Sequence, residues 1–215
     1  MGLTIINGVK ALGLREKQKK DKLLRIRSAA HDLFLERGFE GTTTRKVAEI
    51  AGVSHATVFL YAKDKRDLLF LVFNDDLDKV AKKARSAVDS SAPLVEQYMQ
   101  LFRPFYTYFA KDPQIGLLGI HEYNTAVVGA DSPQMERVKA RAKALQDCIY
   151  QIVKSCQDGG EISADLDTEL ASRLIRSTYL NEIDFWLQTT QLDVEQGLSV
   201  LKDMIALIYR GLQSN

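Results

Sequence analysis

Residues 42–69 constrain the fold of this 215-residue chain more than any other stretch. Two short segments with helical apolar spacing, at about 44–51 and 55–61, are separated by a turn that contains Gly52 and Ser54. Glycine adopts a positive φ at little cost, and a serine directly before a helix caps it with its hydroxyl. The stretch therefore predicts two short helices joined by a tight turn, an arrangement that lays the second helix in the major groove of DNA.

Small and apolar side chains occupy the positions at which two such helices must pack together. These side chains are Val47, Ala48, Ala51, Val53 and Val58. One more helix is predicted before the motif, over about residues 21–37. Apolar residues recur there at helical spacing, and Gly38 follows as a helix-ending glycine does. The three helices predict a helix-turn-helix DNA-binding domain over residues 21–64.

Charge is distributed unevenly along the chain. The first 70 residues hold 14 Lys and Arg against 8 Asp and Glu, whereas the remainder holds 15 against 20. A basic N-terminal part followed by an acidic remainder favours a polyanionic partner for the first 70 residues only. We expect residues 1–20 to form a basic, flexible leader, whose cationic run at 15–22 is compatible both with a solvated surface and with phosphate binding.

The rest of the chain is predicted to be helical throughout. Helix-start signals, such as Asp112-Pro113 and Ser132-Pro133, recur along it, and no stretch alternates as a strand would. The predicted helices begin at Asp64 and cover about 94–110, 113–128, 133–157, 167–190 and 193–213. The sequence therefore predicts an all-α fold of about nine helices.

Residues 29–69 resemble the N-terminal domain of the TetR family of transcriptional regulators. The matching pieces are Ala30, Leu33-Phe34, Gly38-Phe39, Thr42-Thr43, Val47-Ala48, Ala51-Gly52-Val53-Ser54, Thr57-Val58-Phe59, Tyr61, Lys65 and Leu68-Leu69. The resemblance implies a cytoplasmic homodimer that binds a palindromic DNA operator, most often as a repressor. It also implies that residues 65–215 form a helical domain for dimerisation and for sensing a small apolar or amphipathic ligand.

The resemblance also implies which residues contact DNA. Thr43 and Lys65 would bind phosphates, and Arg45 would reach a base edge or a phosphate. The expected set is Thr43, Arg45, Ser54, His55, Ala56, Thr57, Phe59, Tyr61 and Lys65, in which His55, Ala56 and Thr57 would read bases. Phe59 is a departure, because the family usually has a tyrosine there whose hydroxyl binds phosphate, and Tyr61 could replace that contact.

Two further sets follow from the helical body. The expected dimer-interface residues are Leu170, Leu174, Leu198, Leu201, Ile205 and Ile208, for which intrachain core is the alternative. The expected ligand-binding residues are Phe102, Phe105, Tyr106, Phe109, His121, Tyr123, Tyr179, Glu182 and Trp186. Aromatic side chains with polar groups among them suit an apolar pocket, although aromatic residues at helical spacing also form ordinary core.

Enzyme, cofactor and metal functions are not expected. The three histidines and two cysteines lack metal-ligand spacing, and the sequence has no nucleophile elbow, phosphate-binding glycine loop or HExxH motif. Cys148 and Cys156, on one predicted helix, lie about 12 Å apart along its axis, too far for a disulfide. No apolar stretch is long enough to span a membrane, so a membrane partner is not expected.

Two other functions remain open at this point. Phe59 favours a helical ligand-binding or interaction protein whose DNA-binding head is vestigial. A DNA-bound regulator that answers to a protein partner instead of a small molecule is the third possibility. Arg45, Lys65 and the cationic run favour the ligand-responsive DNA-binding regulator.

Overall fold

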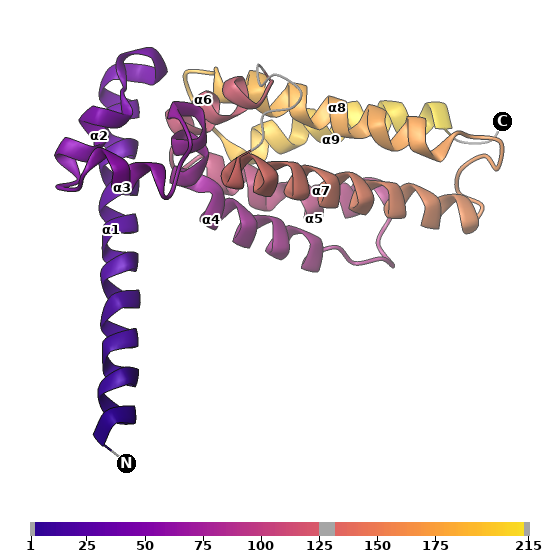
Figure 1. Ribbon diagram of the computed structural model, residues 1–215. Helices are drawn as coiled ribbons and strands as arrows, with labels where there is room; N and C mark the ends of the chain where they lie inside the picture. Colours follow the sequence, from indigo (N-terminus) through magenta and orange to yellow (C-terminus); the bar gives the residue numbers. More distant parts are fainter. Residues whose placement is uncertain (1–2, 125–131, 213–215) are drawn as a thin grey trace. The chain divides into compact units, whose positions relative to one another are not determined.

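The computed structural model describes residues 3–124 and 132–212, with side chains described within 14–123 and 132–212. These residues form nine helices and no strand, which confirms the all-α prediction (Figure 1). The helices are α1 (Leu3–Gly41), α2 (Thr44–Ile50), α3 (His55–Phe59), α4 (Lys65–Ser86), α5 (Leu94–Phe109), α6 (Pro113–Asn124), α7 (Pro133–Asp158), α8 (Thr168–Leu187) and α9 (Val194–Leu212). Among them, no helix has the length and apolar character needed to cross a bilayer.

The chain divides into two compact units. The first contains the described residues of Met1–Phe73 and Gly129–Met135, and the second contains those of Asn74–Val128 and Glu136–Asn215. Helices α4 and α7 each begin in the first unit and continue into the second.

The predicted helix starts are confirmed by their capping bonds. The Asp64 carboxylate accepts a hydrogen bond from the Asp67 N–H at 2.8 Å, and the Asp167 carboxylate accepts one from the Leu170 N–H at 3.0 Å. These bonds satisfy N–H groups that the helix itself leaves without partners. The predicted end of α6 near residue 128 lies outside the described residues.

Helix α1 differs from the expectation at its beginning. It starts at Leu3, so residues 3–20, for which we expected a basic, flexible leader, are part of this helix. The segment contains no proline that would stop a helix from extending upstream. The predicted break at Gly38 is present, because this residue has φ 67° and ψ −176° within the helical span.

A buried carboxylate joins the start of α7 to the start of α4 within the first unit. The side chain of Asp67 accepts hydrogen bonds from the Lys63 N–H at 2.8 Å, from the Gln134 N–H at 3.1 Å and from the Ser132 hydroxyl. Such a buried group is tolerated only when its oxygens are paired, as they are here. The first residues of α7 are therefore fixed to the beginning of α4.

In the second unit, arginines from α7 pair with carboxylates from α4. Asp78 accepts hydrogen bonds from Arg137 at 2.6 Å and from Arg141 at 2.7 Å, and Arg141 also donates to Asn74 at 3.0 Å. Burial opposes ionisation of Asp78, but the two guanidinium groups outweigh it and lower the pKa of this carboxyl. Burial in turn lowers the pKa of Arg141. These bonds hold α4 and α7 in register.

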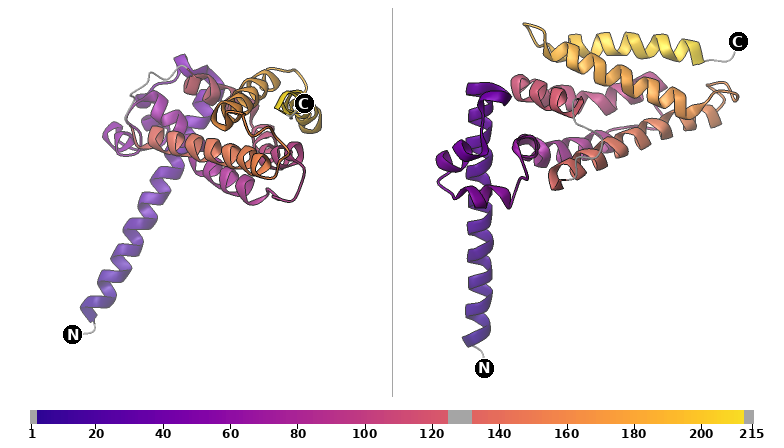
Figure 2. Two further views of the ribbon diagram at one scale, coloured as in Figure 1. Left: turned by 90° about the vertical axis from the view of Figure 1, so that its right-hand side faces the viewer. Right: turned by 45° about the horizontal axis from the view of Figure 1, so that its top comes forward.

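The core of the second unit lies where α5, α8 and α9 meet. Figures 1 and 2 show α8 and α9 side by side, and both helices pack on α5. Cys148 and Cys156 both lie on α7 as free thiols, as predicted, and burial raises the pKa of Cys156 to about 11.

Candidate DNA-binding surface and ligand pocket

Helices α2 and α3 form the predicted helix-turn-helix. The Thr43 hydroxyl accepts a hydrogen bond from the Lys46 N–H at 3.2 Å, and the Ser54 hydroxyl accepts one from the Thr57 N–H at 3.1 Å. Gly52 has φ 61° in the turn between the helices, a conformation that other residues adopt only with strain. The local chemistry of these residues therefore sets both the length of the helices and the angle between them.

The motif presents one face to the core and the other to solvent. Val47, Ala48, Ala51 and Val58 are buried, as the sequence predicts. Of the nine residues expected to contact DNA, Thr43, Arg45, Ser54, Ala56 and Phe59 are exposed, and His55, Thr57, Tyr61 and Lys65 are half-buried. All nine side chains therefore retain surface that a DNA duplex could contact, and their roles remain predictions.

His55 is held in place by two neighbours. Its Nε2 lies 2.9 Å from the Thr44 hydroxyl, and its ring packs edge-on against Phe59 with the ring centroids 4.6 Å apart. Thr44 thus orients a predicted base-reading side chain. Sequence reasoning missed this role because Thr44 and His55 lie on different helices.

Two of the expected phosphate contacts have intramolecular partners. The Tyr61 hydroxyl donates to the Lys19 carbonyl at 3.2 Å, and this bond ties α1 to the segment after α3. The Lys65 ammonium lies 3.2 Å from a Glu40 carboxylate oxygen and 4.3 Å from the centroid of the Phe39 ring. Both side chains therefore support the first unit, which the sequence did not predict for them.

The residues expected at the dimer interface differ in exposure on α8 and α9. Leu198, Leu201 and Ile205 are buried within the chain, which favours the alternative that they are intrachain core. Leu170 and Leu174 are exposed, and Ile208 is half-buried. The sequence missed the other large apolar side chains that α8 and α9 expose, namely Phe185, Val200, Met204 and Leu207.

Eight of the nine candidate pocket residues divide into a packed cluster of five rings and three separate side chains, and Glu182 is described below. The Tyr179 ring stacks on Phe102 with centroids 4.2 Å apart and lies 6.0 Å from Phe105, and Tyr106 lies 4.7 Å from Trp186. All five rings are buried. His121 is exposed, Phe109 lies against Gly116, and the Tyr123 hydroxyl accepts a hydrogen bond from Arg176 at 3.1 Å. These three residues do not join the cluster of stacked rings.

Polar groups are buried beside these rings. Burial raises the pKa of the Glu182 carboxyl, and burial together with the negative charge of Glu182 raises the pKa of Tyr106. The Tyr106 hydroxyl is buried and has no hydrogen-bond partner among the described residues. An unpaired buried hydroxyl is costly, so this position is suited to a polar atom of a bound molecule.

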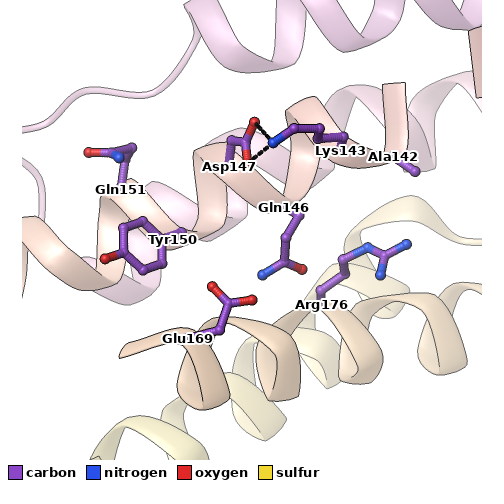
Figure 3. A pocket seen from close by; sticks show the side chains of 8 residues that line it. All are labelled: Ala142, Lys143, Gln146, Asp147, Tyr150, Gln151, Glu169 and Arg176. Carbon is purple, nitrogen blue, oxygen red and sulfur yellow. Dashed lines mark hydrogen bonds and ion pairs between the residues drawn. The ribbon is translucent and has the colours of Figure 1, made fainter. Parts of the chain in front are cut away.

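An open cavity of about 630 Å³ lies between α7 and α8. Figure 3 shows Gln146 of α7 and Glu169 of α8 pointing into the space between the helices, with Arg176 at its edge. The Gln146 amide donates to Ser172 at 2.8 Å, yet its Oε1 and the Arg176 Nε are buried without partners in the described part of the chain. Two residues that line the cavity thus each hold one buried, unpaired polar atom, an acceptor on Gln146 and a donor on Arg176, and sequence reasoning did not select either residue.

Comparisons with known proteins agree with this architecture. Residues 26–72 match the family model "Bacterial regulatory proteins, tetR family". The chain is 24% identical to the fatty acid metabolism regulator protein of Bacillus subtilis, over 81% of this chain and 88% of that protein. It is 25% identical to the HTH-type transcriptional repressor KstR2 of Mycolicibacterium smegmatis, over 90% of each chain.

A solved structure extends the similarity to the whole helical body. Thermus thermophilus FadR, a TetR-family transcriptional repressor in complex with lauroyl-CoA, superposes with a TM-score of 0.62 at 25% identity, over 90% of this chain and 96% of that one. The matched residues 26–72 contain α2 and α3 entirely, and the relatives are named as a regulator and a transcriptional repressor. The chain therefore carries the DNA-binding domain of the TetR family at residues 26–72, and it is similar to TetR-family regulators over most of its length.

Proposed function

We propose that this protein is a homodimeric repressor that binds palindromic operator DNA through α2 and α3 and that an acyl-CoA thioester releases it. The capped helix-turn-helix, with its apolar face buried and its polar face exposed, is the observation that carries the proposal. Residues 21–64 would form the DNA-binding domain, and residues 65–215 would form the sensing and dimerisation domain. One such motif reads only a few base pairs, so two copies on paired half-sites supply the specificity.

The proposed effector class rests on relatives and on the chemistry of the second unit. The Bacillus subtilis relative is named for fatty acid metabolism, and the Thermus thermophilus structure contains lauroyl-CoA. An acyl-CoA has a long apolar part and a large polar part. The second unit offers buried aromatic rings beside an unpaired Tyr106 hydroxyl and a polar cavity with unpaired atoms on Gln146 and Arg176. This combination supports an amphipathic ligand better than a purely apolar one.

Two helices provide a route from the effector to the DNA-binding domain. Helices α4 and α7 supply residues to both units, and Asp67 binds the first residues of α7 at the start of α4. The Gln134 side chain also donates to the Tyr61 carbonyl at 3.3 Å. A ligand that shifts α7 would therefore displace the segment directly after α3. An effector regulates DNA binding only if it binds the DNA-competent and incompetent conformations with different affinities.

Fluorescence anisotropy with a labelled duplex from the promoter beside the gene tests the proposal. We expect salt-sensitive binding that is tighter than binding to random duplex DNA. Lauroyl-CoA should weaken it at least about tenfold, which corresponds to about 1.4 kcal/mol of coupling. Free CoA and laurate are the matched controls, because each has one part of the thioester. Equal affinity for promoter and random DNA would refute the proposed operator binding. Unchanged binding with lauroyl-CoA would refute acyl-CoA as the effector class.

Phe59 lets the contribution of a single phosphate contact be measured. Its ring is about half exposed at the end of α3, so a para hydroxyl would point toward solvent or DNA without disturbing the core. We expect Phe59→Tyr to tighten promoter binding about 30-fold, because each copy of the dimer gains one hydrogen bond and each bond contributes roughly 1 kcal/mol. The control is Leu60→Tyr, which adds the same phenol at the next exposed position. Identical affinities of Phe59→Tyr and the wild type would show that position 59 does not contact a phosphate.

A further inference from the structure

The upstream part of α1 carries an exposed group of cations outside the family match. These cations are Arg15, Lys17, Lys19, Lys20, Lys22 and Arg25, and the match begins only at residue 26. All six side chains are exposed, and none has an ion-pair partner within the described residues. A solvated helix surface usually mixes both signs of charge, whereas the same span contains only two acidic residues, Glu16 and Asp21.

Three of these cations lie on the face of α1 that packs into the first unit. Arg15, Lys19 and Lys22 are spaced i, i+4 and i+7, and the same stripe continues at Ile26 and Leu33, which are fully buried. The stripe is therefore apolar where α1 supports the helix-turn-helix and cationic where it extends beyond it. Lys17 and Lys20 lie on other faces of the same helix, because they are out of register with the stripe.

Contacts within the first unit place the cationic segment beside the DNA-binding motif. The Lys19 carbonyl accepts the hydrogen bond from Tyr61, just after α3. At the turn between α2 and α3, a Cβ added to Gly52 would lie 3.3 Å from Nη1 of Arg25. Upstream of Lys19, α1 continues to Leu3, about 24 Å at 1.5 Å per residue, and Figures 1 and 2 show it running past α2 and α3.

We propose that Arg15, Lys19 and Lys22 form a second DNA-contact surface that binds backbone phosphates beside the half-site read by α3. This inference rests on the proposed function. Exposed cations without partners bind phosphates by releasing counterions from DNA, and they do so without reading sequence. An anionic membrane would instead require a continuous apolar face on the helix. Between residues 14 and 25 the large exposed apolar side chains are only Leu14 and Leu24.

Two double variants with equal charge loss test the surface. Arg15→Gln/Lys22→Gln removes two cations from the stripe, and Lys17→Gln/Lys20→Gln removes two from the other faces. Both leave the bond between Tyr61 and Lys19 in place. Anisotropy is measured with the promoter duplex over a series of salt concentrations. The DNA-bound dimer carries each substitution twice, so four cations are lost. For the stripe pair, we therefore expect the slope of log K against log salt to fall by about 3.6, at roughly 0.9 per lost phosphate contact.

The control pair should leave this slope nearly unchanged, and circular dichroism should show equal helix content for both variants. With a duplex trimmed to the half-sites, the difference between the pairs should disappear, since the flanking phosphates are then absent. Equal losses from both pairs would overturn the inference, as would unchanged slopes. So would binding to phosphatidylglycerol vesicles that depends on the stripe while DNA binding does not.

The failure of this inference can be distinguished from the failure of the proposed function. A wild-type protein that binds promoter and random DNA equally refutes the operator-binding function. The salt slopes of the two variants on random DNA still decide whether the stripe binds phosphates, because phosphate contacts do not depend on sequence.

Discussion

The double substitution Phe185→Glu/Leu207→Glu is expected to convert the protein to monomers and to abolish tight operator binding. These two side chains are 70% and 63% exposed in the single chain, although both are large and apolar. Phe185 shares a stripe of α8 with Leu170 and Leu174, and Leu207 shares one of α9 with Val200 and Met204. Exposed apolar stripes on two adjacent helices are typical of a helix-bundle interface with a second copy.

The expected size of the effect follows from symmetry. Each substitution occurs in both copies, so four carboxylates would be buried, and each buried unpaired charge costs several kcal/mol. We expect the dissociation constant of the dimer to rise at least about 100-fold, or about 2.8 kcal/mol. Operator affinity should fall by about 10² to 10⁴, because the two half-sites would no longer be bound by linked domains.

Sedimentation velocity measures the oligomeric state, and anisotropy with the promoter duplex measures binding. Ser199→Glu is the matched control, since it places the same charge at an exposed position of α9 outside the stripe. This control should remain dimeric and bind DNA normally. A dimer that persists with glutamate at both 185 and 207 would assign the interface to another surface.

Helix α9 shows why the sequence could not tell the expected interface from intrachain core. Leu198, Leu201 and Ile205 are spaced as one helical stripe, and Val200, Met204 and Leu207 are spaced as another. Periodicity indicates that each set shares a face, but it does not say which face meets α5 and α8. The structure buries the first set and exposes the second, so the more apolar stripe is intrachain core.

The helix-turn-helix could be predicted because its determinants are local. Thr43 and Ser54 each cap the helix that follows directly by accepting a bond from the N–H three residues downstream, and Gly52 needs only its own φ to form the turn. The bond from Tyr61 to Lys19, by contrast, joins residues 42 positions apart. No spacing rule covers such a contact, so it appears only once α1 is packed against the motif.

The candidate ligand site was the least predictable part, because packed core and pocket use the same kinds of residue. The aromatic pattern of α5 predicted that Phe102, Phe105 and Tyr106 face inward, and all three are buried. It could not show whether the rings fill the space or line it. Gln146 and Arg176 carry buried, unpaired atoms, but their sequence positions did not indicate burial, because polar residues on a helix normally face solvent.

Trp186→Ala is expected to lower the free energy of unfolding by about 3–5 kcal/mol, the usual cost of removing a large buried side chain. The indole lies 4.7 Å from the Tyr106 ring and donates from Nε1 to the Asp193 carbonyl at 3.0 Å. A Cβ added to Gly197 would lie 2.7 Å from the indole and 2.8 Å from Tyr106, so Gly197 of α9 packs directly against both rings. Neighbouring groups packed this closely leave a cavity when the indole is removed.

Urea unfolding at a fixed protein concentration measures the loss, with Trp186→Phe and His121→Ala as controls. Trp186→Phe keeps an aromatic ring but loses the hydrogen bond to the Asp193 carbonyl. This lost bond should lower the free energy of unfolding by about 1 kcal/mol, in addition to the effect of the smaller ring on packing. His121 was a candidate for the same pocket but is exposed, and its replacement should change stability by less than about 0.5 kcal/mol. If Trp186→Ala costs less than about 1 kcal/mol yet prevents release by lauroyl-CoA, the indole lines the effector site. A large loss of stability places it in the core, and the effector must then bind against other side chains, beginning with Gln146 and Arg176.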